Sequence, residues 1–308
     1  MEKRTFGRTG LQVSVLGYGG APAAFLDSEQ QQTAKMIGRL LDAGMNVIDT
    51  AMAYPGSEEF LGKYLSGRRK DFVLISKCGQ KIPESDTHEW SYETVSRSID
   101  RSLRLLKTDF VDVMLLHSCD LNMLKKGDAF RALADAREKG KIRFAGYSGD
   151  NDAVAWAAAQ SDVAVVEMSL NMVDQINIDV ALPVTKKHNV GLLAKRPIAN
   201  AAWKDISQQP GMYKSYASEY TERFKKMGLT LGDLGYNDSD SRAWAEIALR
   251  FTLSFPEVHC AIIGTTSARN AQANLAAAEQ GPLPSELVKK IRDAFHKADA
   301  KKQWRGLT

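Results

Sequence analysis

Short apolar runs rich in β-branched residues alternate along the chain with longer stretches in which apolar residues recur every three or four positions. Runs of the first kind are typical of buried strands, and stretches of the second kind are typical of amphipathic helices. The strand-like runs are Val13–Leu16, Val47–Asp49, Phe72–Lys77, Val111–His117, Ile142–Tyr147, Val163–Met168, Gly191–Lys195 and Cys260–Ile263. This alternation predicts repeated βα units around a parallel sheet.

Several of the helical stretches open on Ser or Asp, residues that cap free backbone N–H groups. The predicted helices include Ser28–Ala43, Ser57–Leu65, Ser91–Leu106, Asp152–Ala159, Asp179–His188 and Arg242–Ser254. Eight strands joined through helices by right-handed crossovers close into a (β/α)8 TIM barrel. An open doubly wound sheet is the alternative. Against it, the first strand-to-helix junction, GYGGAPAAFLDSEQ, has no G-x-G-x-x-G leading into a helix, so a Rossmann cofactor site is not expected.

Two segments depart from the βα rhythm. Residues 5–13, TFGRTGLQV, predict an N-terminal β-hairpin laid across one end of the barrel, with a turn near Gly7 and Gly10. Residues 197–241 form a long polar excursion between strands seven and eight, with a helical pattern near residues 216–226. Loops of that length inside a compact domain tend to be functional. The tail over residues 283–300 predicts one more amphipathic helix, and no linker divides the chain, so we expect a single domain over residues 1–308.

Composition narrows the class of protein. Hydrophobic residues make up 44% and charged residues 25% of the 308 residues, which is typical of a soluble globular protein. The net charge of +4 is dispersed along the chain, so a nucleic-acid partner is not expected. The unpaired spacing of Cys78, Cys119 and Cys260 argues against a disulfide framework or a metal cluster. With no signal-peptide pattern and no membrane-length apolar run, we expect a cytoplasmic protein without a membrane partner, and the oligomeric state stays open.

Ionisable residues end three consecutive strand-like runs: Asp49, Lys77 and His117. Because the active sites of βα barrels lie at the carboxyl ends of the strands, these side chains are expected to converge there, and Tyr54 in the following loop can reach the same place. Each also has a structural alternative: a cap for Asp49, surface exposure for Lys77, packing for Tyr54 and a structural histidine for His117. Their joint position on neighbouring strands favours the chemical interpretation.

The four side chains suit the reduction of a carbonyl group. A phenol with a pKa near 10 holds a proton at neutral pH, and a nearby ammonium such as that of Lys77 stabilises the phenolate left after proton donation. Asp49 would pair with the buried ammonium, and His117 would orient the substrate oxygen. Since no side chain donates hydride, this interpretation requires a nicotinamide.

A phosphate of that cofactor could bind where strand eight meets a helix. The residues there are Gly264, Thr265, Thr266 and Ser267, with Arg269 nearby. Simple N-capping of the helix explains the same residues.

Over essentially its whole length the chain resembles the aldo-keto reductase family. The resemblance rests on TFGRTGLQVSVLGYGG, NVIDTAMAYPGSEEFLGKYL, FVLISKCG, SIDRSLRLLKTDFVDVMLLH and AIIGTTSARNAQANL. It implies NADPH, or less often NADH, bound without a Rossmann domain, an aldehyde or ketone as the small-molecule substrate, and a catalytic tetrad at Asp49, Tyr54, Lys77 and His117. It also implies cofactor contacts at Ser148, Gly149, Glu167, Lys195, Arg196, Pro197, Ile198, Gly264, Thr265, Thr266, Ser267, Arg269, Asn270 and Asn274.

The chain departs from the family pattern at several of these positions. Gly149 stands where Asn is common, Glu167 where Gln is common, and Lys195 and Arg196 where an aromatic residue usually precedes the proline. Asn270 stands where an Arg often binds the 2′-phosphate. Two other functions stay open. One is a regulatory subunit that holds the cofactor, as in the potassium-channel β-subunits, and the other is a cofactor-free barrel enzyme that uses Lys77 as a Schiff-base amine.

Overall fold

The computed structural model describes residues 1–25, 29–82, 86–208 and 214–308. Eight parallel strands form a closed barrel in the order β10-β3-β4-β5-β6-β7-β8-β9. Their bounds are β3 Leu16–Gly19, β4 Val47–Asp49, β5 Val73–Cys78, β6 Val111–His117, β7 Ile142–Ser148, β8 Val165–Ser169, β9 Gly191–Lys195 and β10 Cys260–Ile263. The predicted (β/α)8 barrel is confirmed.

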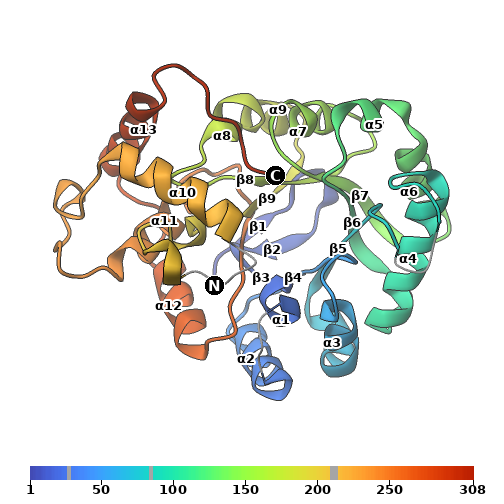
Figure 1. Cartoon of the computed structure of the whole chain (residues 1–308). Helices are drawn as coiled ribbons and strands as arrows, with labels where there is room; N and C mark the ends of the chain where they lie inside the picture. The colour runs from blue at the N-terminus through green and yellow to red at the C-terminus, as the bar shows by residue number, and fades with distance from the viewer. Residues whose placement is uncertain (26–28, 83–85, 209–213) are drawn as a thin grey trace.

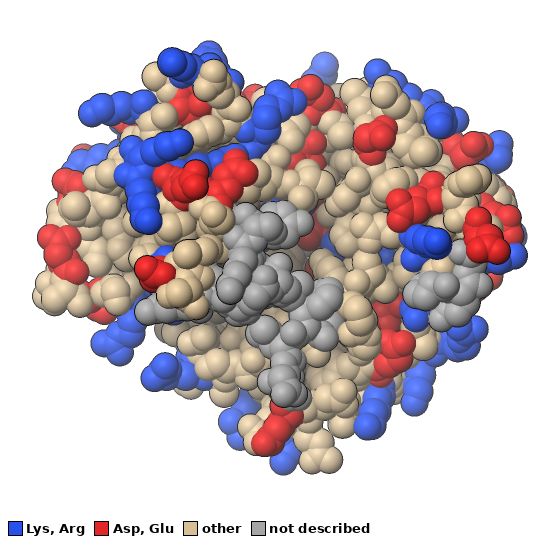
Figure 2. Space-filling view, viewed as in Figure 1, with Lys and Arg blue, Asp and Glu red and all other residues tan. Residues whose placement is uncertain are grey.

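The helices surround the strands as a ring, and the C-terminus lies near the centre of the view (Figure 1). Their bounds are α1 Ala21–Phe25, α2 Gln30–Asp42, α3 Ser57–Tyr64, α4 Tyr92–Leu106, α5 Leu121–Lys126, α6 Asp128–Glu138, α7 Asn151–Ala158, α8 Ile176–Val180, α9 Leu182–Lys187, α10 Lys214–Met227, α11 Ala243–Leu253, α12 Ala268–Glu279 and α13 Ser285–Ala298. Acidic and basic side chains are interspersed around the rim of the same face (Figure 2). Within the described ranges, no helix is both long and apolar enough to cross a bilayer.

Successive side chains of each strand point alternately inward and outward. On β6, Val113 and Leu115 pack in the apolar cluster that fills the barrel, whereas Met114 and Leu116 pack in the larger cluster beneath the helices. On β5, Val73 and Ile75 likewise face inward. Continuing this period of two residues turns the side chains that end the strands inward as well, one layer above the apolar interior.

The N-terminal hairpin closes the barrel at the amino ends of the strands. It consists of β1 Lys3–Thr5 and β2 Gln12–Ser14, which pair antiparallel, and it brings Phe6 and Val13 into the interior cluster. A Cβ on Gly7 would lie 2.4 Å from the backbone nitrogen of Gly191, so the hairpin approaches β9 as closely as glycine permits. The predicted hairpin across one end of the barrel is therefore confirmed, and it covers the amino ends of the strands.

The predicted first barrel strand, Val13–Leu16, is wrong. Val13 belongs to the hairpin strand β2, and the barrel strand β3 begins at Leu16. The apolar run spans a corner at which Ser14 donates a hydrogen bond to the Leu16 carbonyl oxygen. Two buried strands that follow each other without a polar turn look like one strand in a hydrophobicity pattern.

The helices that follow β6 and β8 depart from the sequence prediction. The predicted helix Asp179–His188 is divided at Ala181 into α8 and α9, because Pro183 stands in the first turn of α9. The predicted start at Ser28 lies outside the described residues, and α2 begins at Gln30. The pair α5 and α6 after β6 was not among the predicted helices.

The long excursion over residues 197–241 contains α10 and the 3-10 helices η3 Ala199–Ala201, η4 Ile206–Gln208 and η6 Gly232–Leu234, and α11 follows it before β10. It is therefore mostly helical in its described part. Its α10 packs on α13, the predicted C-terminal helix, at one side of the barrel (Figure 1).

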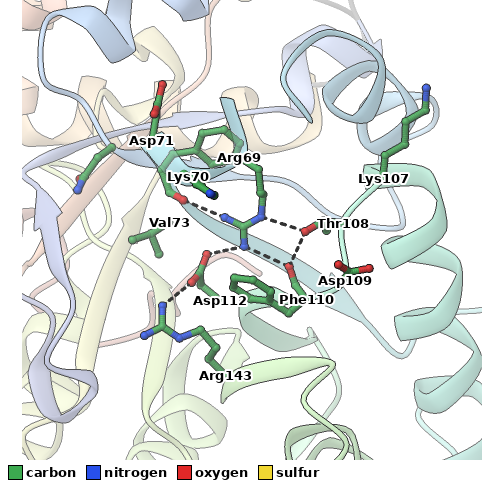
Figure 3. A pocket seen from close by; sticks show the side chains of 12 residues that line it. Arg69, Lys70, Asp71, Val73, Lys107, Thr108, Asp109, Phe110, Asp112 and Arg143 are labelled. Carbon is green, nitrogen blue, oxygen red and sulfur yellow. Dashed lines mark hydrogen bonds and ion pairs between the residues drawn. The ribbon is translucent and has the colours of Figure 1, made fainter. Parts of the chain in front are cut away.

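A pocket at the amino ends of β5, β6 and β7 contains an ion cluster (Figure 3). Asp112 on β6 accepts hydrogen bonds from Arg69 at 2.7 Å, Arg143 at 2.8 Å and the backbone nitrogen of Leu74 at 2.9 Å. Arg69 also donates to the carbonyl oxygens of Phe72 and Phe110. These hydrogen bonds join the amino ends of the three strands through one carboxylate.

Candidate active site

The carboxyl ends of β4, β5 and β6 bring Asp49, Lys77 and His117 together. Each follows an inward-facing residue of the barrel interior by two positions, and the same period places Glu167 of β8 inward, two residues after Val165. Inward positions near the carboxyl ends of four strands therefore carry polar groups directly above an apolar floor. These groups are largely shielded from water.

Lys77 is the centre of this arrangement. Its Nζ donates hydrogen bonds to both carboxylate oxygens of Asp49 at 2.6 Å and to the carbonyl oxygen of Thr50 at 3.1 Å. It also forms an ion pair with Oε2 of Glu167 at 3.1 Å. The side chains of Lys77, Asp49 and Glu167 are no more than 4% exposed. The buried ammonium is therefore held between two carboxylates.

Tyr54 and His117 lie beside this ion cluster. The Tyr54 ring centroid is 5.5 Å from Nζ of Lys77 and 6.0 Å from the centroid of the His117 ring, and the two rings stand at 86° to each other. Trp90 donates from Nε1 to the carbonyl oxygen of His117 at 3.0 Å and so supports the end of β6. Among the described residues, Nδ1 of His117 has no hydrogen-bond partner. A polar atom without a partner beside a phenol is suited to a polar ligand.

Burial controls the protonation of these groups. Desolvation raises the pKa of Tyr54 to about 12 and outweighs the attraction of Lys77, so the phenol keeps its proton. Desolvation, aided by Lys77, lowers the pKa of His117 well below its usual value, so the imidazole is neutral. Desolvation also opposes the charge of Lys77, but Asp49 and Glu167 outweigh it and raise the pKa of the ammonium. The site therefore combines a protonated phenol, a neutral imidazole and a charged lysine.

The predicted contacts on β7 and β8 lie next to this cluster. Ser148 pairs in register with His117 on one side and with Glu167 on the other. Gly149 donates from its backbone nitrogen to the carbonyl oxygen of Glu167 at 3.0 Å. A Cβ at Gly149 would lie 2.2 Å from the Tyr147 hydroxyl oxygen, which explains why glycine stands there. Their roles as cofactor contacts stay predictions.

The loop after β9 places two cations at the rim. Lys195 pairs with Asp150 at 2.9 Å, and Arg196 donates to Oγ of Ser169 at 3.0 Å. Pro197 is buried, and Ile198 packs beside it against the outer side of the barrel. Arg196, Ala199, Asn200 and Ala201 all have positive φ values between 47° and 56°. Such strain is common at ligand-binding loops, and it persists only where surrounding contacts hold it.

The loop after β10 contains the predicted phosphate-binding residues. Ser267 caps α12 by accepting from the backbone nitrogen of Asn270, and Thr265 accepts from the backbone nitrogen of Ser267. The predicted N-cap of α12 is therefore present. It occupies one backbone N–H group at the N-terminus of this helix. The other predicted residues of this region are Gly264, Arg269 and Asn270, which are exposed, Thr266, which is partly exposed, and Asn274, which is buried.

Sequence reasoning missed Asp150 and the C-terminal residues. Asp150 binds Lys195 and also accepts from the Ser169 backbone nitrogen at 2.7 Å and from the Thr308 hydroxyl at 2.9 Å. A carboxylate directly after Ser148-Gly149 at a strand end is a signal that could have found it. For the tail there was no such signal, because the carbonyl oxygen of Leu307 accepts from Arg196, which is 111 residues away in the chain.

Comparison with known proteins identifies relatives that match most of the chain. The chain is 26% identical over 292 residues to an L-galactose dehydrogenase of Arabidopsis thaliana, a match that covers 90% of this chain and 88% of the relative. It is also 26% identical to an Arabidopsis thaliana protein described as a voltage-gated potassium channel subunit beta, with 94% of each chain covered.

A solved aldo-keto reductase from Bacillus halodurans, in its holo form, shares the fold with a TM-score of 0.75. It has 24% identity, and 96% of each chain is covered. The sequence pattern of the Aldo/keto reductase family matches residues 15–295, which is most of the barrel and its helices. The chain therefore belongs to the aldo/keto reductase family.

Proposed function

We propose that this protein reduces an aldehyde or ketone to an alcohol with a nicotinamide cofactor, preferably NADPH. The observation that carries the proposal is the meeting of Tyr54, Lys77 and His117 above the barrel interior, with Lys77 bound to Asp49 at 2.6 Å. Membership of a family whose relatives include dehydrogenases supports it.

Tyr54 is the proton donor in this proposal. Negative charge builds on the carbonyl oxygen as the carbon is reduced, and a positioned acid lowers that barrier. The Tyr54 phenol is protonated because burial raises its pKa to about 12, and the Lys77 ammonium stabilises the phenolate once the proton has left. The neutral His117 ring donates a hydrogen bond that orients the carbonyl oxygen.

Residues around the mouth fit a dinucleotide. Ser148 and Gly149 lie at the end of β7, the cations of Lys195 and Arg196 lie at the end of β9, and the N-terminus of α12 with Arg269 suits a phosphate. These residues would hold the cofactor extended across the barrel. When bound, the nicotinamide supplies the hydride that no side chain can provide. Exposed Arg269 favours the extra phosphate of NADPH over NADH.

Replacing Tyr54 by Phe tests the proposal. We expect Tyr54→Phe to retain NADPH binding, measured by fluorescence titration, and to lose carbonyl reduction by about 10²-fold or more in an aldehyde and ketone panel, because the proton donor is gone. Tyr64→Phe is the matched control, since its ring packs on Phe60 of α3 outside the site. Full turnover by Tyr54→Phe would refute the assignment of Tyr54.

A cofactor-binding regulatory subunit is the second candidate, favoured by the similarity to a protein described as a potassium channel subunit. It predicts that the wild-type protein binds NADPH but reduces no member of the panel. The Schiff-base alternative has little support, because the two carboxylates paired with the Lys77 ammonium outweigh desolvation and raise its pKa. A lysine in that state is a poor nucleophile.

A further inference from the structure

Glu167 gives the buried ion cluster of the candidate site one more negative charge than positive charges. Its side chain comes from β8 and reaches Lys77 of β5 across the barrel interior, with Oε2 and Nζ 3.1 Å apart. Asp49 already occupies the same ammonium with both carboxylate oxygens. One positive charge thus faces two carboxylates in a place where all three side chains are almost completely buried.

Such a cluster carries one surplus negative charge when every member is ionised. Buried charge that lacks a partner is costly, and two carboxylates that share one site do not both ionise freely. Taking up one proton removes the surplus while leaving Lys77 charged. Because the two carboxylates interact, that proton belongs to the pair rather than to either residue.

We propose that Glu167 is a positioning residue that acts through Lys77: its carboxylate makes the cluster of Asp49, Lys77 and Glu167 hold an extra proton near neutral pH and keeps the Tyr54 phenol protonated. The proposal rests on the proposed carbonyl reduction. It assigns Glu167 a role distinct from the cofactor contact that the sequence predicts, since the carboxylate is already held by Lys77.

The charged and titratable groups around the cluster favour the uptake of one proton by its two carboxylates. Desolvation first, and then the charge of Glu167, raise the pKa of Asp49 to about 7 against the attraction of Lys77. The other groups that face the cluster from neighbouring elements are Tyr54, His117, Cys260, Lys195 and Arg196. Both cations at the rim act on Asp150: Lys195 pairs with it at 2.9 Å, and against desolvation the charges of Lys195 and Arg196 lower the pKa of this carboxyl.

The extra proton has a consequence for stability that requires no catalysis. A carboxyl with a pKa of about 4 in the unfolded chain and about 7 in the folded protein binds more protons when folded, so folding loses stability as the pH rises from about 4 through 7. We expect Glu167→Gln to remove the part of this loss that comes from the charge of Glu167, while the part that comes from desolvation remains. The fall in melting temperature between pH 5 and pH 8 should then be smaller than in the wild type by about 2 °C or more.

Glu246→Gln is the matched control for this measurement, because it removes a glutamate that pairs with Arg250 on α11, outside the site. It should keep the wild-type pH dependence. If Glu167→Gln also keeps it, the cluster holds no extra proton and the proposal is overturned. Should Glu167→Gln fail to fold, Glu167→Asp retains the charge at a longer distance from Lys77 and is expected to weaken the pH dependence.

The kinetic test separates the role of Glu167 from simple cofactor binding. In Glu167→Gln, we expect the alkaline limit of carbonyl reduction to move down by about one pH unit, since Tyr54 then loses its proton more easily. Cofactor KM should change little. A tenfold rise in cofactor KM with an unchanged pH limit would make Glu167 a cofactor contact and overturn the proposal. If the wild type reduces no carbonyl, the proposed function fails, while the melting experiment still tests the proton-holding cluster.

Discussion

At the scale of single residues, Lys77 has the most demanding environment of the candidate site. It is 1% exposed and is the cation that two buried carboxylates share. Removing one partner from a buried ion cluster leaves uncompensated charge, which costs far more than the intact cluster contributes. The residue proposed to assist the proton donor is therefore also a structural residue.

Lys77→Met should destabilise the protein by about 3–5 kcal/mol at pH 8, because Asp49 and Glu167 then lie buried without a cation. The cost should be smaller at pH 5, where those carboxylates bind protons more readily. Chemical denaturation at the two pH values measures both. Lys186→Met is the control: it removes an exposed lysine that pairs with Glu257 at 2.8 Å, and should destabilise the protein far less than Lys77→Met, because water screens an exposed ion pair. Equal costs for the two variants would contradict this account.

At the scale of elements, the two ends of the strands serve different purposes. The amino ends of β5, β6 and β7 are joined by Asp112, whose single carboxylate pairs with both Arg69 and Arg143 (Figure 3). The carboxyl ends instead hold a surplus carboxylate and a histidine whose Nδ1 has no partner within the described part of the chain. Polar groups at the amino ends of a barrel usually stabilise it, whereas those at the carboxyl ends act on ligands.

Asp112→Ala should lower stability by about 3–5 kcal/mol without a specific effect on carbonyl reduction. The carboxylate is 5% exposed and binds two arginines and a backbone N–H group of β5; Arg143 and the N–H group lose this acceptor, and Arg69 keeps only its bonds to neutral oxygens. Denaturant unfolding and NADPH titration of the same variant separate the two effects. Asp109→Ala, an exposed acid lining the same pocket, should change stability by less than about 0.5 kcal/mol. A loss of NADPH binding in folded Asp112→Ala would disagree with a purely structural role.

At the scale of the whole molecule, the last residues of the chain tie together elements that are distant in sequence. Arg305 accepts at its carbonyl oxygen from Arg223 of α10, and Leu307 donates from its backbone nitrogen to Asp174 at 3.0 Å. Thr308 donates to Asp150, which also holds Lys195. The tail therefore connects the long excursion with the ends of β7, β8 and β9 beside the candidate site.

Deleting residues 305–308 should lower the melting temperature by about 4 °C or more, because buried Asp150, Asp174 and Arg223 each lose a hydrogen bond worth about 1 kcal/mol or more. Thermal unfolding followed by circular dichroism measures the change. Lys301→Ala, which alters an exposed residue just before this segment, should leave the melting temperature within about 1 °C. A deletion variant that melts like the wild type would show that these contacts contribute nothing.

Local patterns were sufficient for the barrel and for most of the candidate site. The period of two residues in each strand fixes which side chains face inward, and so Asp49, Lys77 and His117 could be predicted at one end. The same pattern was less informative where two elements follow each other closely. It merged the hairpin strand with β3, and it did not show that Pro183 divides the helix after β8.

By itself, the sequence determined the family, the closed barrel, the hairpin and the meeting of Asp49, Tyr54, Lys77 and His117, because strand period and chain order are local properties. Only the tertiary structure decided that Glu167 shares Lys77, that Asp150 holds Lys195, and that the tail binds Arg196. These contacts join residues that lie 45 to 111 positions apart in the chain. They also depend on which acceptor a long side chain reaches, which no local pattern shows. Barrel closure brings such groups together. Because closure also buries them, their charges interact strongly and the protonation of one group depends on the others.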